Sequence, residues 1–303
     1  MRAIITSVLA FLSVITCFSQ TSKEYFDRGL ENSNNQYYEE AINDFNAALA
    51  GNPDYADAFF FRGVAKCSLE DYSGGIADFT KAISINPEYA DAYYFRGSVH
   101  YSLLNLKEAV SDFDRVLEID PANTNIFLMR GTAKFELQNF SGALDDLNRA
   151  ITLNPQSPEA FYQRGIVNSS MDNLTAALED FNRSIELGLT DGEVYFQRGM
   201  TKSGLEDFEG AIYDFDKFLE INPMDAGVYM HRGQAKLMLF ETDKALADLD
   251  KSLELNPDNG GAYYLRAVVY IYQGLKETAC LNANMALNLG FEGAQELINE
   301  NCL

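Results

Sequence analysis

The sequence predicts an all-α protein built from one helix-turn-helix unit that occurs eight times. The dipeptide Arg-Gly recurs every 34 residues, at 28-29, 62-63, 96-97, 130-131, 164-165, 198-199 and 232-233, and Arg266-Ala267 continues the series. A fixed period of this length, without insertion or deletion, is typical of stacked supersecondary units rather than of one globular core. Apolar residues make up 47% of the 303 residues, which is enough to bury a core.

Charge and composition exclude several classes of function. The chain carries 45 acidic and 23 basic residues, for a formal net charge of −22. Such a charge repels nucleic acids and anionic lipid head groups. With two histidines, His100 and His231, and no Ser-His-Asp set, phosphate-binding glycine loop or HExxH motif, the sequence offers little for metal binding or catalysis. We therefore expect no enzyme activity, cofactor, metal site or small-molecule substrate.

Residues 1–19 are expected to be a secretory signal peptide. Arg2 is followed by an apolar run over residues 3–18, and small residues Cys17 and Ser19 precede a cleavage site before Gln20. The run is short for a membrane anchor. An alternative is lipoprotein processing at Cys17, although Thr16 matches a lipobox poorly. The chain is expected to be exported, to the periplasm or the outer membrane.

Four further positions repeat with the arginine. We number each period 1–34 from residue 22, so that this arginine stands at place 7. Place 4 is aromatic: Tyr25, Phe59, Tyr93, Phe127, Phe161, Tyr195, Tyr229 and Tyr263. Place 20 is small: Ala41, Gly75, Ala109, Ala143, Ala177, Ala211, Ala245 and Ala279. Place 24 is Phe45, Phe79, Phe113, Leu147, Phe181, Phe215, Leu249 and, as an exception, Ala283; place 32 is Pro53, Pro87, Pro121, Pro155, Pro223 and Pro257.

These places define two packed helices in each unit. Places 4, 7, 8 and 11 fall on one stripe of a first helix, and places 20, 24 and 27 on one stripe of a second. Glycine at place 8 and a small residue at place 20 permit close approach, and the large residues at places 4 and 24 fill the space beside it. The residue before proline leaves the helical region, so the second helix ends there. Where proline is missing, Gly188 and Gly290 stand one place earlier as helix caps.

The arginine at place 7 has a candidate partner in the same unit. Place 23 is Asp44, Asp78, Asp112, Asp146, Asp180, Asp214 and Asp248, followed by Asn282. A cation and an anion beside the packing contact predict a series of part-buried ion pairs. The alternative is that place 23 faces solvent, where each pair is worth ~0–1 kcal/mol. The aspartates stand 34 residues apart, which does not suit a calcium site.

This pattern resembles the tetratricopeptide repeat over residues 22–293. The resemblance implies an all-α right-handed superhelical solenoid whose concave face is formed by the first helix of each unit, and a role in protein binding. Arginine at place 7 departs from the leucine usual in the family. The implied organisation is a signal peptide (1–19), eight repeats (22–55, 56–89, 90–123, 124–157, 158–191, 192–225, 226–259 and 260–290) and a C-terminal cap (291–303).

The last segment is expected to cover the open end of the array. Residues 291–300 can form a helix with Ala294, Leu297 and Ile298 facing inward. The segment resembles the end of many exported bacterial tetratricopeptide proteins, in which two cysteines recur. This resemblance implies a disulfide between Cys280 and Cys302, worth ~3 kcal/mol for a loop of this length. Two free thiols are the alternative. Cys67 is expected to be free.

The resemblance also locates a candidate binding groove on the first helices. In the family, places 2, 5, 6, 9, 12 and 13 line the concave face, and one variant of the family clamps a carboxylate terminus with lysine and asparagine. In this chain place 5 is aromatic or aliphatic throughout, so carboxylate clamping is not expected. Repeats 2–4 are the most apolar stretch, which gives the candidate groove residues Phe60, Phe61, Val64, Tyr94, Phe95, Tyr101, Met129 and Phe135. Place 2 adds acids: Asp57, Asp91, Glu159 and Glu193. The alternative is that these rings only pack against neighbouring repeats.

The sequence therefore predicts a non-catalytic scaffold that binds a protein or peptide. The expected ligand is an extended or helical segment with apolar anchors and lysine or arginine flanks. The alternative function is a lipid-anchored envelope protein with a mainly structural role in assembling an outer-membrane complex.

Overall fold

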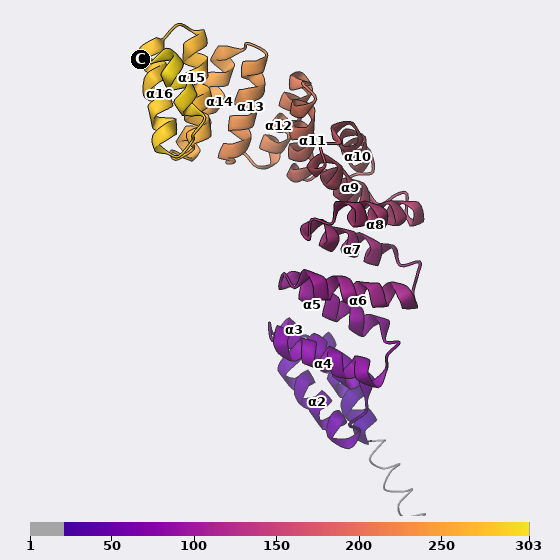
Figure 1. Ribbon diagram of the computed structural model, residues 1–303. Helices are drawn as coiled ribbons and strands as arrows, with labels where there is room; N and C mark the ends of the chain where they lie inside the picture. The colour runs from indigo at the N-terminus through magenta and orange to yellow at the C-terminus, as the bar shows by residue number, and fades with distance from the viewer. Residues whose placement is uncertain (1–20, 303) are drawn as a thin grey trace, which may run out of the picture. The chain divides into compact units, whose positions relative to one another are not determined.

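The computed structural model describes residues 21–302, which contain α-helices and turns but no strand. The predicted signal peptide and Cys17 lie outside this range. Residues 21–34 form the first helix. The helices that follow, labelled in Figure 1, are α2 (Tyr38–Gly51), α3 (Ala56–Ser68), α4 (Tyr72–Ile85), α5 (Ala90–Ser102), α6 (Leu106–Ile119), α7 (Thr124–Glu136), α8 (Phe140–Leu153), α9 (Pro158–Ser170), α10 (Leu174–Glu186), α11 (Gly192–Gly204), α12 (Phe208–Ile221), α13 (Ala226–Met238), α14 (Thr242–Leu255), α15 (Gly260–Tyr272), α16 (Lys276–Asn288) and α17 (Ala294–Asn301).

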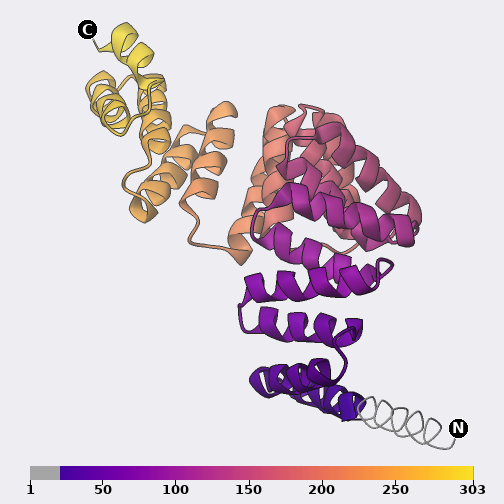
Figure 2. The same cartoon turned by 60° about the horizontal axis from the view of Figure 1, so that its bottom comes forward.

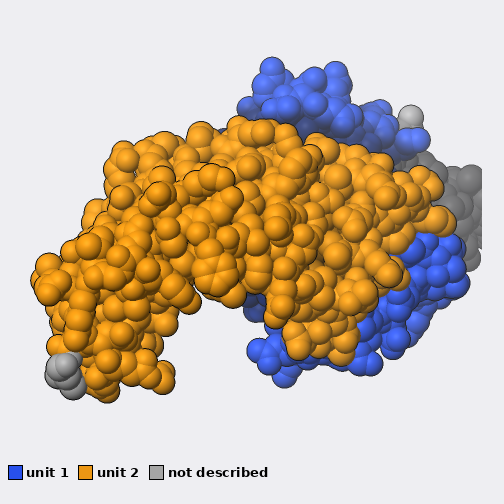
Figure 3. All heavy atoms as spheres, turned by 90° about the horizontal axis from the view of Figure 1, so that it is seen from above, with its two compact units in different colours: residues 1–153 blue, residues 154–303 orange. Residues whose placement is uncertain are grey.

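The chain divides into two compact units, residues 1–153 and 154–303 (Figure 3). In the first unit the hairpins α3–α4, α5–α6 and α7–α8 follow one another, and each packs against the preceding helix (Figure 2). In the second unit the hairpins α9–α10, α11–α12, α13–α14 and α15–α16 pack in the same way, and α17 covers α16. The predicted all-α architecture of repeated helix pairs is confirmed.

In repeats 1 to 7 each hairpin is closed by a large side chain that packs on a glycine, a phenylalanine ring in five repeats and Leu147 or Leu249 in the other two. A methyl group added at Gly63 would lie 2.8 Å from the Phe79 ring, and one at Gly165 would lie 2.7 Å from Phe181. The same contact joins places 8 and 24 in repeats 1 to 7, and every residue at place 24 has an exposed fraction of 0%. In repeat 8 the ring is replaced by Ala283, and the glycine by Ala267. Glycine at place 8 is therefore required by the volume of the ring.

The turn within each hairpin uses a left-handed residue at place 15. This residue has a φ between 58° and 73° in all eight repeats: Gln36, Glu70, Leu104, Gln138, Asp172, Glu206, Phe240 and Gly274. In repeat 2 the backbone N–H of Asp71 donates to the carbonyl of Lys66 at 2.9 Å, and that of Glu70 to Cys67 at 3.0 Å. These bonds satisfy carbonyls at the end of α3. Only one of the eight residues is glycine, so the sequence did not reveal this turn.

Two glycines end second helices that lack a following proline. Gly188 after α10 has φ +102°, and Gly290 after α16 has φ +86°. Both values lie in the left-handed region that favours glycine. The predicted caps are confirmed at both positions.

The C-terminal segment covers the last repeat. Ala294 is fully buried, Leu297 and Ile298 are half-buried, and the helix begins at Ala294, three residues later than expected, after the turn at Gly290. A disulfide joins Cys280 on α16 to Cys302 just after α17. Cys67 is a free, half-buried thiol, and burial raises its pKa to about 11.

Within residues 21–302, the helices are too short or too polar to cross a lipid bilayer.

Phe113→Ala is expected to destabilise the protein by ~3–5 kcal/mol, because it empties a fully buried position. Phe240→Ala is the matched control, since this ring is 73% exposed and its loss should cost less than about 1 kcal/mol. Chemical denaturation of both variants measures the difference. Equal losses of stability would show that Phe113 does not contribute to the core as proposed.

Candidate functional site: the inner face of the first helices

The first helices are held in place by the arginine at place 7. In repeats 2 to 7 its Nη2 lies 2.5–2.6 Å from the carboxylate at place 23 of the same repeat. Arg28 and Asp44 form the same ion pair in repeat 1. All seven aspartates are at most 6% exposed. The predicted part-buried ion pairs are confirmed.

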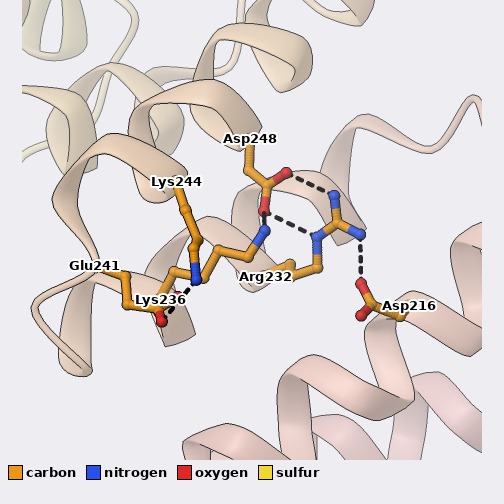
Figure 4. A network of polar contacts seen from close by, with 6 residues as sticks. All are labelled: Asp216, Arg232, Lys236, Glu241, Lys244 and Asp248. Atoms are coloured by element: carbon orange, nitrogen blue, oxygen red, sulfur yellow. Dashed lines mark hydrogen bonds and ion pairs between the residues drawn. The ribbon is translucent and has the colours of Figure 1, made fainter.

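The same guanidinium also reaches the preceding hairpin. Its Nη1 donates to the side-chain oxygen at place 25 of the repeat before, 16 residues earlier in the chain. Within the two units, these acceptors are Asn46, Thr80, Asp114, Asn182, Asp216 and Asp250, at 2.5–2.9 Å. In Figure 4, Arg232 lies between Asp248 and Asp216. One side chain therefore fixes both the helix pair and its neighbour.

The aromatic ring at place 4 packs against this arginine. In all eight repeats the guanidinium carbon lies 5.0–5.8 Å from the centre of that ring, one turn earlier on the same helix. Arginine stacks readily on aromatic faces. The ring at place 4 thus orients the guanidinium as well as filling the interhelical space.

Most buried aspartates receive a second donor from place 11. Lys66, Lys134, Lys202 and Lys236 pair with them at 2.7–2.8 Å, and Asn32 and Asn168 donate at 2.8 and 3.0 Å. Burial alone would lower the pKa of Arg232, but hydrogen bonds to Asp248 and Asp216 raise it above its ordinary value. In repeat 8, Arg266 Nε donates to the neutral Asn282 at 2.7 Å.

We call the face of the first helices that carries places 5, 6, 9 and 13 the inner face. In repeats 2 and 3 this face carries a continuous row of rings. Phe60 lies 5.0 Å from Phe61 and 5.3 Å from Phe95, and Phe95 lies 5.2 Å from Tyr94. Phe60 is only 5% exposed, so it supports the surface and does not line it. Phe61, Tyr94, Phe95 and Val64 are half-buried. The structure brings the first five predicted groove residues together on α3 and α5.

The residues at place 6 also take part in packing between repeats. Phe61 lies 5.8 Å from Phe26 and 6.4 Å from Phe45, both in repeat 1. Phe95 lies 6.1 Å from Phe79 in repeat 2. These side chains therefore have one face against the preceding hairpin and one edge toward solvent.

The three remaining predicted groove residues lie in two separate locations. Tyr101 and Met129 are half-buried and pack around the core of repeat 3 together with Tyr94. Phe135 instead lies 5.8 Å from Phe140, near the turn of its own hairpin. Phe135 is thus separate from the row of rings. Phe26, which the sequence analysis did not assign to the groove, extends the row into repeat 1.

Exposed acids at place 2 and a cavity occur in each of the two units. Asp57, Asp91, Glu159 and Glu193 at place 2 are all exposed. A 380 Å³ cavity between repeats 3 and 4 is lined by Asp91, Tyr94 and Asp120, among others. In the second unit, a 550 Å³ cavity in repeat 6 is lined by Glu193, Phe218 and Asp225, among others. Both cavities combine apolar walls with carboxylates.

The two histidines pack within the repeats. Residues 21–302 hold no cluster of three or more histidine, cysteine, aspartate or glutamate side chains that could bind a metal ion. His231 lies 5.8 Å from Phe196 and 6.2 Å from Phe215. Burial lowers the pKa of His231, against the opposing effect of Asp225. His100 takes place 11 of repeat 3, where its Nδ1 is buried without a hydrogen-bond partner in the described structure.

Asp214→Asn is expected to destabilise the protein by about 3–5 kcal/mol, because it leaves the cations of Arg198 and Lys202 beside a neutral group at a fully buried position. Glu118→Gln, which breaks the exposed pair with Arg115, is the control and should cost less than about 0.5 kcal/mol. Urea denaturation compares the two. Similar small losses would mean that the buried pairs contribute little.

Acidification should destabilise the wild type more than His231→Gln. Because the pKa of His231 is lowered in the folded state, the unfolded chain takes up the proton first as the pH falls through its ordinary value of 6.5. The stability that the neutral imidazole provides is present above that pH and is lost below it. Melting temperatures at about pH 7.5 and about pH 5 measure this. Equal acid-induced shifts in both proteins would contradict it.

Comparisons with known proteins follow the repeat pattern. Protein-family models described as tetratricopeptide repeat match residues 26–66, 90–123, 192–224 and 226–259. A further family model, described as TPR repeat, matches residues 131–172. No curated protein matches the chain closely enough to count as a relative.

Several solved structures share the fold. A tetratricopeptide repeat protein from Parabacteroides merdae is 19% identical, with a TM-score of 0.61 over 82% of this chain and 99% of the other. MamA is 24% identical, with a TM-score of 0.52 over 57% of this chain and 94% of its own. YrrB, a TPR protein with an unusual peptide-binding site, is 27% identical, with a TM-score of 0.55 over 61% of this chain and 95% of its own. With its helix pairs and its repeat matches, this chain belongs to the tetratricopeptide repeat family.

Proposed function

We propose that the protein is a non-catalytic scaffold that binds a segment of a partner protein on the inner face of α3, α5 and α7. Tetratricopeptide repeats generally serve protein interactions. The observation that carries the proposal is the partly exposed apolar surface of Phe61, Val64, Tyr94, Phe95 and Met129, bordered on one edge by exposed acids. Apolar surface within a polar rim is typical of binding sites.

The chemistry of this face selects the segment. Apolar side chains of the segment would contact the row of rings, and lysine or arginine flanks would meet Asp57 and Asp91 at the edge. The net charge of −22 attracts a basic partner over a longer range. The similar protein YrrB has a peptide-binding site, which supports the same class of ligand.

We also propose that the protein works outside the cytosol. The N-terminal sequence predicts export, and a disulfide between Cys280 and Cys302 persists best in an oxidising compartment. Mass spectrometry of the natural protein tests this by measuring whether the chain begins at Gln20 and whether the disulfide is oxidised.

Site-specific photo-crosslinking in cells tests the binding surface. A benzophenone amino acid at Ser102, an exposed residue of α5 at place 13, should capture the partner. The matched control is the same amino acid at Asp145, an exposed residue on the second helix α8. Capture from Asp145 alone would contradict the proposal.

The captured segment then permits a quantitative test. Thr132→Lys, on the inner face of α7, should weaken binding of the purified segment at least about tenfold, whereas Asp145→Lys should leave it unchanged. Phe61 is less suitable for this experiment, because it also packs against repeat 1. Circular dichroism checks that both variants fold.

A further inference from the structure

The cavity between repeats 3 and 4 has a defined chemistry. It lies where α5 begins, beside the turn before α7, and it measures 380 Å³. Its walls include Tyr94 at place 5, Asp91 at place 2 and Asn123 at place 34 of repeat 3, with the apolar side chains of Val116 and Ile126. The Asp91 carboxylate is exposed, and Tyr94 is half-buried.

The chain fills the equivalent position in its first two repeats with its own tyrosine. Place 34 is Tyr55 in repeat 1, and its ring lies 4.8 Å from that of Phe26 at place 5, inclined by 35°. In repeat 2, Tyr89 lies 5.1 Å from Phe60 at place 5, inclined by 38°. The two repeats therefore use the same ring-on-ring contact.

In repeat 2 a carboxylate acts on the phenol in this position. Burial raises the pKa of Tyr89, and the Asp57 carboxylate raises it further. Asp57 stands at place 2, which corresponds to Asp91 in repeat 3. Place 5 thus supplies the apolar floor for a tyrosine, and place 2 supplies a carboxylate that acts on its phenol.

Repeat 3 keeps the floor and the carboxylate but not the tyrosine. Asn123 occupies place 34, and its side chain accepts a hydrogen bond from the backbone N–H of Ile126 at 3.3 Å. Among the described residues, the ring that lies beside Tyr94 is that of the adjacent residue Phe95, at 5.2 Å. The space that Tyr89 fills in repeat 2 is the open cavity in repeat 3.

We propose that this cavity binds a tyrosine side chain of the partner segment, with its ring on Tyr94 and its hydroxyl donated to Asp91. The inference rests on the proposed function and names one anchor of the segment. Tyrosine is favoured because the chain itself places a tyrosine on the ring at place 5 in repeats 1 and 2, the two repeats before this cavity. A lysine or arginine drawn by Asp91 and Asp120 is the competing occupant.

Saturation-transfer NMR with N-acetyl-L-tyrosinamide tests the cavity in the chain from Gln20 onward. The wild type is expected to show transfer, and Asn123→Tyr is expected to reduce it about tenfold by filling the space from within. Tyr55 and Tyr89 occupy this place without a side-chain cap to α3 or α5, so the fold tolerates the substitution. Asn123→Ala removes the same cap without filling the cavity, and it should keep the transfer.

The acceptor is tested with N-acetyl-L-phenylalaninamide and N-acetyl-L-argininamide. The wild type should prefer tyrosinamide to phenylalaninamide about tenfold, the effect of one hydrogen bond to a charged group, and Asp91→Ala should remove that preference. Absence of tyrosinamide transfer, undiminished transfer in Asn123→Tyr, or stronger binding of argininamide would overturn the inference. If crosslinking from Ser102 succeeds in that case, the proposed function stands without this anchor.

Discussion

The arginine at place 7 is the interaction on which the rest of the structure depends. Its guanidinium packs on the ring at place 4, pairs with the aspartate at place 23, and donates to place 25 of the preceding hairpin. A planar group with five donors can satisfy two acceptors on opposite sides at once, which a lysine ammonium on a flexible stem does less well. The orientation within a hairpin and the orientation between hairpins are therefore set by one side chain.

This arrangement separates the constant positions from those available for binding. Places 4, 7, 8, 20, 23 and 24 are occupied by the ion pairs and by the contact between ring and glycine. Places 2, 9 and 13 take no part in the ion pairs or in the contact between ring and glycine, so they are free to vary. The ring at place 5 is more constrained, because it packs on place 24, as Phe60 does on Phe79 at 5.8 Å. Specificity can thus change along the inner face while the packing of each unit stays the same.

The sequence predicted the helix pairs, the contact between glycine and ring, and the pairing of places 7 and 23, because each depends on residue types that recur at a fixed spacing. It did not predict the bond to place 25, where Asn46, Thr80 and Asp114 share nothing except an acceptor oxygen. The turn at place 15 was also missed, since its residues range from Glu70 to Phe240 and only Gly274 shows the usual signal.

The arrangement of the candidate binding surface was predicted only in part. Periodicity locates Phe60 and Tyr94 on the same face, but it does not show which ring is covered. That difference arises at place 34, where Tyr89 covers Phe60 and Asn123 leaves Tyr94 open. The cover comes from the turn between two repeats, so it depends on tertiary structure.

A crystal structure of the protein bound to the segment captured from Ser102 is the most direct test of how this repeat array works. The account predicts that the segment lies along α3, α5 and α7, in contact with the partly exposed rings of Phe61, Tyr94 and Phe95. A segment bound to the second helices α4, α6 and α8 would contradict it.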